Sequence, residues 1–244
     1  MQYDIVIDIG NTRAKTAIYN DAKLSGMFSG APDLMDLPGW VTEKTYGYGI
    51  VSLNNTPDKK LNKVLQQLCK NMIYMSATLP LPLSINHETP DTLGHDRKAA
   101  CVGAAYLYPE KNLFIIDAGT AITYDFVSAS GIMEGGNISP GLSMRFKALH
   151  NYTGKLPLLK PGNMKQILGQ STEQSIRNGV QYGIISEVKW YKKLMEKQYK
   201  GLITVVTGGD AAFLAKNLKN SIFVHSNLVL IGLYRILKHY VETD

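Results

Sequence analysis

Short apolar segments alternate with amphipathic ones along most of the chain. β-Branched runs bounded by turn residues predict strands at 3–9, 14–20, 24–29, 46–53, 72–76, 113–118, 121–127, 132–138, 202–207 and 222–225. Apolar residues at helical spacing predict helices at 57–70, 96–108, 141–150, 171–183, 184–199, 211–218 and 228–241. The stretches 80–82 and 155–162 contain prolines and are predicted to be irregular connections. This alternation predicts an α/β protein.

Two stretches of the chain resemble each other. The sequences IVIDIGNT near the N-terminus and FIIDAGT near the middle are β-branched strands that end in an acidic residue and run through a glycine turn to a threonine. Nearly half the chain separates the two acidic residues, Asp8 and Asp117. We therefore predict duplicated domains, 1–112 and 113–244, that face each other across a ligand cleft. The last helix could pack back on the first domain.

Composition narrows the class of protein without deciding its function. Of the 244 residues, 45% are hydrophobic and 19% are charged, which is typical of a globular protein and argues against a disordered chain. Two cysteines without a CxxC pair argue against a disulfide scaffold and a cysteine-based zinc site. The N-terminal MQYDIVIDIG has no basic region and no apolar run approaches a membrane span, so we expect a cytoplasmic protein.

The charge pattern and the missing motifs exclude several functions. A net charge of +6 fits an anionic ligand or a nucleic-acid surface equally well. We interpret the lysines at 189–200, which interleave with aromatic residues, as a solvated helix face rather than a nucleic-acid contact. The chain lacks the GxxxxGK[ST] loop, the GxGxxG fingerprint, HExxH and GxSxG. These absences disfavour a P-loop kinase, a Rossmann dehydrogenase and an α/β-hydrolase.

The turn that follows Asp8 has a chemistry that suits phosphate. Its glycine lets the backbone approach an oxyanion closely, while adjacent N–H groups, the Thr12 hydroxyl and the charged Lys15 can contact the oxyanion. The Asp8 carboxylate could hold Mg²⁺ or its waters. One such segment alone would also fit an ordinary β-hairpin. Its recurrence at half-chain spacing favours the phosphate interpretation.

Two further segments carry candidate chemistry. The sequence GHDR at 94–97 opens a helix, where the positive end of the helix dipole would keep Asp96 ionised. The same pattern is also typical of a simple N-cap with a basic neighbour. The sequence VVTGGD at 205–210 is a strand that runs into a glycine turn. Such a turn can admit the flat face of a nucleoside, or it can merely connect a strand to a helix.

The motifs occur in a definite order along the chain: DIGNT at 8–12, GHDR at 94–97, DAGT at 117–120 and TGGD at 207–210. This combination resembles the type III pantothenate kinases, a family of the acetate kinase/sugar kinase/Hsp70/actin superfamily. The similarity runs along almost the whole chain and includes GGNISPG at 135–141 and STEQSI at 171–176.

The resemblance implies a fold and a reaction. The fold would be two ribonuclease H-like, actin-like domains with mixed sheets flanked by helices and a ligand cleft between them. The reaction would be phosphorylation of the pantothenate hydroxyl by ATP, the first step towards coenzyme A. The resemblance further implies Mg²⁺ and a monovalent cation, K⁺ or NH₄⁺, as cofactors, and a homodimer as the assembly.

The resemblance also implies roles for individual residues. Asp96 would be the catalytic proton acceptor, and Asp117 would bind the monovalent cation. The residues implied to contact ATP are Asp8, Ile9, Gly10, Asn11, Thr12, Arg13, Ala14, Lys15 and Thr120. The residues implied to contact pantothenate are His87, Gly94, His95, Asp96, Arg97 and Thr172. His87 departs from the family pattern, which usually has Tyr or Phe at that position.

Two alternatives remain open at this point. The chain could be another small-molecule kinase of the same superfamily, although GHDR argues against this. It could also be a non-catalytic, nucleotide-binding accessory regulator of gene expression, since proteins that resemble this family have been regarded as such factors. Both phosphate turns and Asp96 are intact, which a binding module would not require, and this favours the kinase.

Overall fold

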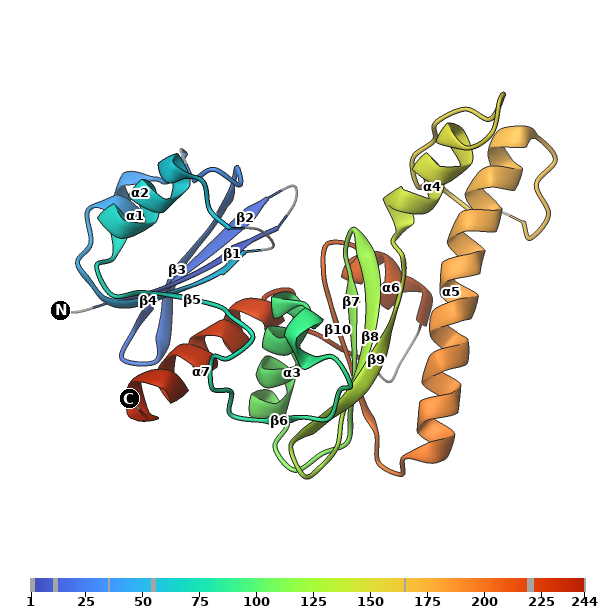
Figure 1. The fold of residues 1–244 in the computed structure, drawn as a ribbon. Coiled ribbons are helices and arrows are strands. Elements are labelled where there is room, and N and C mark those ends of the chain that lie inside the picture. The colour runs from blue at the N-terminus through green and yellow to red at the C-terminus, as the bar shows by residue number, and fades with distance from the viewer. Residues whose placement is uncertain are drawn as a thin grey trace. The chain divides into compact units, whose positions relative to one another are not determined.

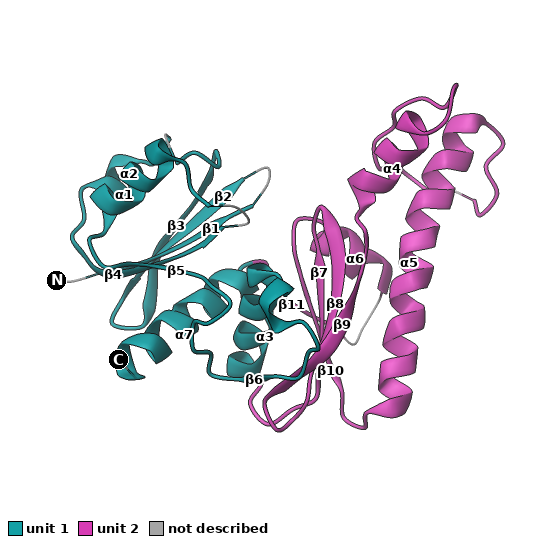
Figure 2. Ribbon diagram, in the orientation of Figure 1, with its two compact units in different colours: residues 1–107, 227–244 teal, residues 108–226 magenta. Residues whose placement is uncertain are grey.

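The computed structural model describes residues 3–10, 13–34, 36–53, 56–164, 166–218 and 222–243. The chain forms two compact units, which are coloured separately in Figure 2. Unit 1 comprises residues 1–107 and 227–244, and unit 2 comprises residues 108–226. The predicted domain boundary after residue 112 stays a prediction, because compactness does not establish which segments fold independently.

Unit 1 is built on a sheet with the strand order β3-β2-β1-β4-β5. Its strands are β1 (Tyr3–Ile9), β2 (Ala14–Asn20), β3 (Lys23–Gly30), β4 (Tyr46–Leu53) and β5 (Met72–Tyr74). The first three strands form an antiparallel meander, whereas β4 runs parallel to β1 and β5 runs parallel to β4. The sheet is therefore mixed, as expected.

Helices cover both faces of this sheet (Figure 1). One face carries α1 (Gly39–Thr42) and α2 (Lys59–Leu68), and the other carries α3 (His95–Leu107) and α7 (Leu228–Thr243). Side chains alternate along β1, so Ile5 and Ile7 join the α1–α2 core while Val6 joins the α3–α7 core. Both sets are fully buried, which explains why this strand reads as an almost continuous apolar run.

Unit 2 repeats the strand order of unit 1. Its strands follow one another in space as β9-β8-β7-β10-β11. Their bounds are β7 (Leu113–Ala118), β8 (Ala121–Val127), β9 (Ile132–Pro140), β10 (Ile203–Thr207) and β11 (Phe223–Val224). Here too a meander of three antiparallel strands is extended by two parallel ones. The expected duplicated, actin-like fold with mixed sheets is thus confirmed.

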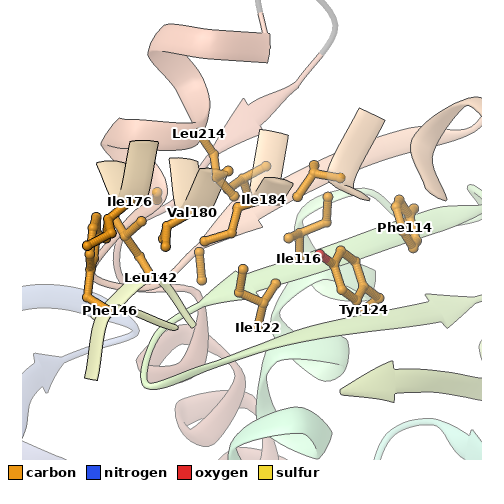
Figure 3. Packing of buried hydrophobic residues seen from close by; sticks show 14 residues of the cluster. Phe114, Ile116, Ile122, Tyr124, Leu142, Phe146, Ile176, Val180, Ile184 and Leu214 are labelled. Carbon is orange, nitrogen blue, oxygen red and sulfur yellow. The ribbon is translucent and has the colours of Figure 1, made fainter. Parts of the chain in front are cut away.

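One face of the unit 2 sheet is covered by α4 (Leu142–Asn151), α5 (Thr172–Gln198) and α6 (Ala211–Leu218) (Figure 1). Figure 3 shows the core between them, where Ile116 and Ile122 of the sheet meet Val180 and Ile184 of α5 and Leu214 of α6. The apolar residues of α5 that enter this core recur every three or four positions, which is the spacing of one helix face.

The observed elements differ from the predicted ones in a few places. The two helices predicted at 171–183 and 184–199 are one continuous helix, α5, because Gly179 and Gly183 interrupt neither its backbone nor its buried face. The short helix α1, the two-residue strand β6 (Ser84–Ile85) and the 3₁₀ turn η1 (Pro90–Thr92) were not predicted. These three elements have too few residues to show a periodic pattern.

Two simpler expectations concern cysteines and membranes. Cys69 and Cys101 are both buried and both free, as expected for reduced thiols. Within the described ranges, every helix is too short or too polar to cross a bilayer.

Candidate functional site

Asp8 is the acidic residue at the end of β1. It lies between Lys15 of β2, its partner across the antiparallel pair, and Ser52 of β4, its partner across the parallel pair. The Ser52 hydroxyl, which is buried, donates a hydrogen bond to the Asp8 carboxylate. Sequence reasoning missed Ser52, because a serine at a strand end gives no signal until the strand that it pairs with is known.

The turn between β1 and β2 is short. The N–H of Gly10 donates to the Arg13 carbonyl over 3.0 Å, which closes the hairpin. Ile9 and Ala14, on either side of the turn, are buried, so their side chains support the hairpin and only their backbone could face a ligand. Asn11 and Thr12, the remaining predicted phosphate contacts, lie outside the described residues.

The charge of Asp8 is costly in this environment. Burial above all, and then the negative charge of Asp96, raise the pKa of Asp8 to about 6. The hydrogen bond from Ser52 and the charge of Lys15 lower this pKa, but by less. The two carboxylates are thus close enough to repel each other, and a divalent cation would relieve that repulsion.

Asp96 lies in the first turn of α3, beside Asp8. Its Oδ1 accepts a hydrogen bond from the backbone N–H of Arg97 over 2.8 Å. An N-cap side chain would instead accept from an amide two or three residues further on, and α3 already begins at His95. Asp96 is therefore not the N-cap residue of α3, although its carboxylate satisfies one of the free amides of the first turn.

The residues around Asp96 fix its position. A Cβ on Gly94 would lie 2.5 Å from Asp96 Oδ1, so a side chain at that position would displace the carboxylate. The Nδ1 atom of His95 lies 3.3 Å from the carbonyl oxygen of Leu53, which holds the start of α3 against the end of β4. Since β4 pairs with β1, this contact explains why Asp96 approaches Asp8.

Two cations follow Asp96 along α3. Arg97 and Lys98 are both buried, with 8% and 1% of their surface exposed. Burial lowers the pKa of Lys98, while the charge of Asp91 raises it. Arg97 was predicted as a substrate contact. Lys98 was not, because a lysine in a helix is usually solvated and the sequence does not reveal that this one is buried.

His87 belongs to the segment that follows β6. The side chain is partly buried, and its Nδ1 accepts a hydrogen bond from the backbone N–H of Thr89 over 3.1 Å. In the neutral ring this leaves the proton on Nε2. The neutral imidazole thus presents a donor at Nε2.

Asp117 of unit 2 ends β7 in the same way that Asp8 ends β1. The turn between β10 and α6 folds over it, since a Cβ on Gly208 would lie 2.4 Å from both Asp117 Oδ1 and the Ala118 carbonyl oxygen. Gly208 has φ +94°, a conformation that favours glycine. The N–H of Asp210 donates to the Ala118 carbonyl over 2.9 Å. The DAGT and TGGD motifs therefore form one local structure.

Thr120 is exposed on the turn that follows Asp117. The turn is closed by the N–H of Gly119, which donates to the Ala121 carbonyl over 2.9 Å. The residue that follows β9 also stabilises this turn, because the N–H of Gly141 donates to the Thr120 carbonyl over 3.1 Å. A Cβ on Gly141 would lie 2.3 Å from the Gly119 carbonyl oxygen, so this approach requires glycine.

Thr172 is the first residue of α5. The preceding Ser171 caps the helix by accepting a hydrogen bond from the backbone N–H of Gln174 over 3.3 Å. Thr172 is exposed and lines an open pocket of ≈ 700 Å³ together with Leu149 and Ser175, among others. Hydroxyls and apolar side chains share this pocket, which suits a polar organic molecule.

The structure gathers the predicted residues into local groups. In unit 1 it brings Asp8, Lys15 and Asp96 together at the end of β1. In unit 2 it brings Asp117 and the turn of Gly208 together at the end of β7. Thr172 stands apart from that second group, at the start of α5. Among the residues that the structure describes, no three His, Cys, Asp or Glu side chains form a metal-binding cluster.

Known proteins resemble this chain over most of its length. The family model of the type III pantothenate kinases matches residues 4–193. A type III pantothenate kinase of Phocaeicola vulgatus is 41% identical over 97% of this chain and 98% of its own length. That of Porphyromonas gingivalis is 39% identical over 99% of this chain and 100% of its own length.

Solved structures confirm the fold. A Campylobacter jejuni protein described as a Baf family transcriptional activator has a TM-score of 0.64 and 24% identity, over 98% of this chain and 99% of its own. The activator of the Clostridium difficile 2-hydroxyisocaproyl-CoA dehydratase, solved with ADPNP, has a TM-score of 0.52 and 14% identity, over 99% of this chain and 97% of its own. At these identities the likeness concerns the fold alone, whereas the sequence relatives share more. The chain belongs to the type III pantothenate kinase family.

Proposed function

We propose that this protein transfers the γ-phosphoryl group of ATP to the hydroxyl of pantothenate and so begins coenzyme A synthesis. The observation that carries the proposal is the placement of Asp96 beside Asp8. It puts a carboxylate from the first turn of α3 next to a turn whose chemistry suits phosphate. The match to the family over nearly the whole chain supports the same reaction.

ATP and a divalent cation, which we propose is Mg²⁺, fit the residues at the end of β1. Asp8 offers a carboxylate whose burial and whose neighbour Asp96 both disfavour its charge, so a cation gains by binding there. Mg²⁺ usually takes one or two carboxylates plus phosphate oxygens, so it needs no larger cluster. Lys15, the register partner of Asp8, is placed to contact a phosphate oxygen. The bound ion would neutralise phosphate charge.

Asp96 accepts the proton of the pantothenate hydroxyl as the phosphorus–oxygen bond forms. It lies in the first turn of α3, where the N-terminal end of a helix favours negative charge. Arg97, the next residue, pairs with the carboxylate of pantothenate. His87 donates from Nε2 to a polar group of the same substrate.

Unit 2 supplies the second set of contacts to ATP in this proposal. Thr120 donates to a phosphate oxygen from its exposed turn. Asp117 binds K⁺ or NH₄⁺, which is supported by the way its Oδ1 and the Ala118 carbonyl oxygen converge on the position of Gly208. Thr172 contributes a hydroxyl to the pantothenate pocket, and two copies of the chain form a homodimer in the cytoplasm.

The decisive test replaces Asp96 by Asn, which is nearly isosteric but cannot take up the hydroxyl proton. We expect the kcat for phosphopantothenate formation to fall by about 10²–10⁴, the usual contribution of a positioned base. The KM for ATP should change little. Glu110→Gln, at an exposed position shortly after α3, is the control and should retain normal kcat. A near-normal kcat for Asp96→Asn would remove this residue from the mechanism.

The wild-type protein separates the proposal from its alternatives. Incubation with ATP and pantothenate, followed by mass detection of phosphopantothenate, tests the substrate directly. A different acceptor from a panel of small alcohols would point to another kinase of the superfamily. Nucleotide binding without any transfer would favour an accessory regulator.

A further inference from the structure

A polar network connects four elements of unit 2 beneath the Thr120 turn. Glu187 of α5 accepts hydrogen bonds from the Tyr124 hydroxyl of β8 over 2.7 Å and from Arg145 Nη2 of α4 over 2.6 Å. The same Nη2 donates to Ser139 Oγ over 2.8 Å, and Arg145 Nε donates to the Pro140 carbonyl over 2.8 Å. Arg145 thereby joins α5 to the last two residues of β9.

The contacts of this network favour the charged form of the Glu187 carboxylate. Burial raises the pKa of Glu187, but hydrogen bonds from Arg145, Tyr124 and Ser139 outweigh it and hold the pKa below its ordinary value. Tyr124 is 1% exposed, and its ring lies in the core of unit 2 (Figure 3). Glu187 is thus anchored from the sheet side, which gives the guanidinium of Arg145 a fixed partner.

The strand end held by Arg145 is the support of the Thr120 turn. Pro140 is the register partner of Ala121, the residue directly after Thr120. Gly141 then donates its N–H to the Thr120 carbonyl, and its approach is too close for any side chain. A shift of this strand end therefore moves Thr120 as well. Nothing in the reaction proposed above uses Arg145 or Glu187.

We propose that Arg145, anchored by Glu187, is a positioning residue that holds the Thr120 turn in the geometry that ATP requires. The inference rests on the proposed function, because it takes Thr120 as an ATP contact. A fork-shaped guanidinium suits this role, since it bonds the strand end and the carboxylate at once. Lys has one nitrogen and cannot reproduce all of these bonds.

The role predicts an effect mainly on one substrate. Thr172, the proposed pantothenate contact, lies 15 residues before Glu187 on α5, which is about 22 Å along the helix axis. The pocket of Thr172 is lined on α4 by Leu149, one turn beyond Arg145, and not by Arg145 itself. Loss of the Arg145 contacts should therefore disturb ATP binding much more than pantothenate binding. A merely structural role would lower the amount of folded enzyme, which reduces kcat without separating the two KM values.

The test compares Arg145→Lys with Glu196→Gln. Glu196 forms an ion pair with Lys192 on α5, the helix that also carries Glu187. Its variant is therefore a control that removes an ion pair of α5 away from the Thr120 turn. We expect Arg145→Lys to raise the KM for ATP about tenfold or more, as a small misplacement of a binding group does, with the KM for pantothenate within twofold of wild type. Glu196→Gln should change neither KM. Equal changes in both KM values for Arg145→Lys, or none, would overturn the proposal.

A binding measurement separates this inference from the proposed function. Calorimetric titration with a non-hydrolysable ATP analogue does not require pantothenate to be the acceptor. If wild type binds the analogue but transfers no phosphate to pantothenate, the proposed function fails while this inference is still tested. Weaker binding of the analogue to Arg145→Lys then supports it, and unchanged binding refutes it.

Discussion

Asp8 carries a charge that the folded protein disfavours. Burial and the charge of Asp96 raise its pKa from the ordinary 3.8 of an aspartate to about 6, so ionising Asp8 costs more in the folded than in the unfolded chain. The folded chain therefore binds more protons at Asp8 than the unfolded chain does between these two pKa values. Stability of the ligand-free protein falls as the pH rises from about 4 through about 6, and the full penalty, on the order of 3 kcal/mol, is present at neutral pH.

We expect Asp8→Asn to stabilise the protein without metal or nucleotide by about 1–3 kcal/mol at pH 7.5, because it removes a buried charge. Asn can still accept the hydrogen bond from Ser52. Urea denaturation at pH 7.5 and pH 4 measures the difference, which should shrink at the lower pH. Asp36→Asn at an exposed position is the control and should show no gain. Equal or lower stability of Asp8→Asn than of wild type at pH 7.5 would contradict the prediction. The affinity of this variant for ATP with Mg²⁺ should be weaker than that of wild type.

Asp117 leads to a second prediction at the residue scale. If its carboxylate and the Ala118 carbonyl oxygen hold a monovalent cation, kinase activity should rise several-fold when potassium or ammonium replaces sodium. Asp117→Ala should lose that response, and steady-state rates in matched chloride salts measure it. A wild-type rate that is indifferent to the cation would refute the cation site.

Residues of the site could be predicted from the sequence where the chain itself places them together. Asp8, Gly10 and Lys15 lie on one hairpin, so their spacing already indicated a phosphate turn. Ser52 and Arg145 act through strands and helices that are distant in sequence, and only the register of the folded sheets brings them to the site. Tertiary pairing, which a single sequence does not reveal, accounts for what was missed.

At the scale of elements, α3 and α7 pack unusually closely through two glycines. A Cβ on Gly232 would lie 1.7 Å from the Ala99 carbonyl oxygen, and one on Gly103 would lie 2.4 Å from the Leu228 carbonyl oxygen. The backbones of the two helices therefore touch. Because α3 also carries Asp96, this contact fixes the helix that presents the proposed base.

We expect Gly232→Ala to destabilise the protein by at least about 2 kcal/mol, because the added methyl must push the helices apart. It should also lower kcat, since α3 moves with Asp96. Gly179→Ala on α5 is the control, because a Cβ at that position would meet nothing within 4 Å. This substitution should stabilise the helix by about 0.5–1 kcal/mol. Thermal denaturation and kcat measure both variants. An unchanged melting temperature for Gly232→Ala would show that the helices can separate without cost.

Regular elements were predictable because their apolar periodicity is strong. The strand Tyr46–Leu53 and the helix Ala211–Leu218 begin and end where the pattern predicts. The pattern failed where an element has about four residues or fewer, as in α1, or where glycines suggested a break that a helix face does not need, as in α5. Propensity is local, whereas continuity of α5 is decided by burial against a whole sheet.

At the scale of the whole molecule, the two units share one strand order, and this follows from the repeat that the sequence displays. Unit 2 also has a connection that exposes apolar side chains. The connection between α4 and α5 leaves large apolar side chains in water, namely those of Tyr152, Leu158, Ile167 and Leu168. Exposed apolar residues that gather on one segment are typical of an interaction surface. The segment also leads directly to Thr172 and its pocket.

We therefore expect the homodimer interface to include this connection. Ile167 and Leu168 are 76% and 78% exposed, so replacing both by Asp should leave the folded chain intact but bury charge if two copies meet there. Sedimentation velocity should show a dimer for wild type and a monomer for this double variant, with a raised KM for pantothenate. Leu24→Asp, at a 52% exposed position of unit 1, is the control and should remain dimeric. A fully active wild-type monomer would refute the dimer, and a dimeric double variant would place the interface elsewhere.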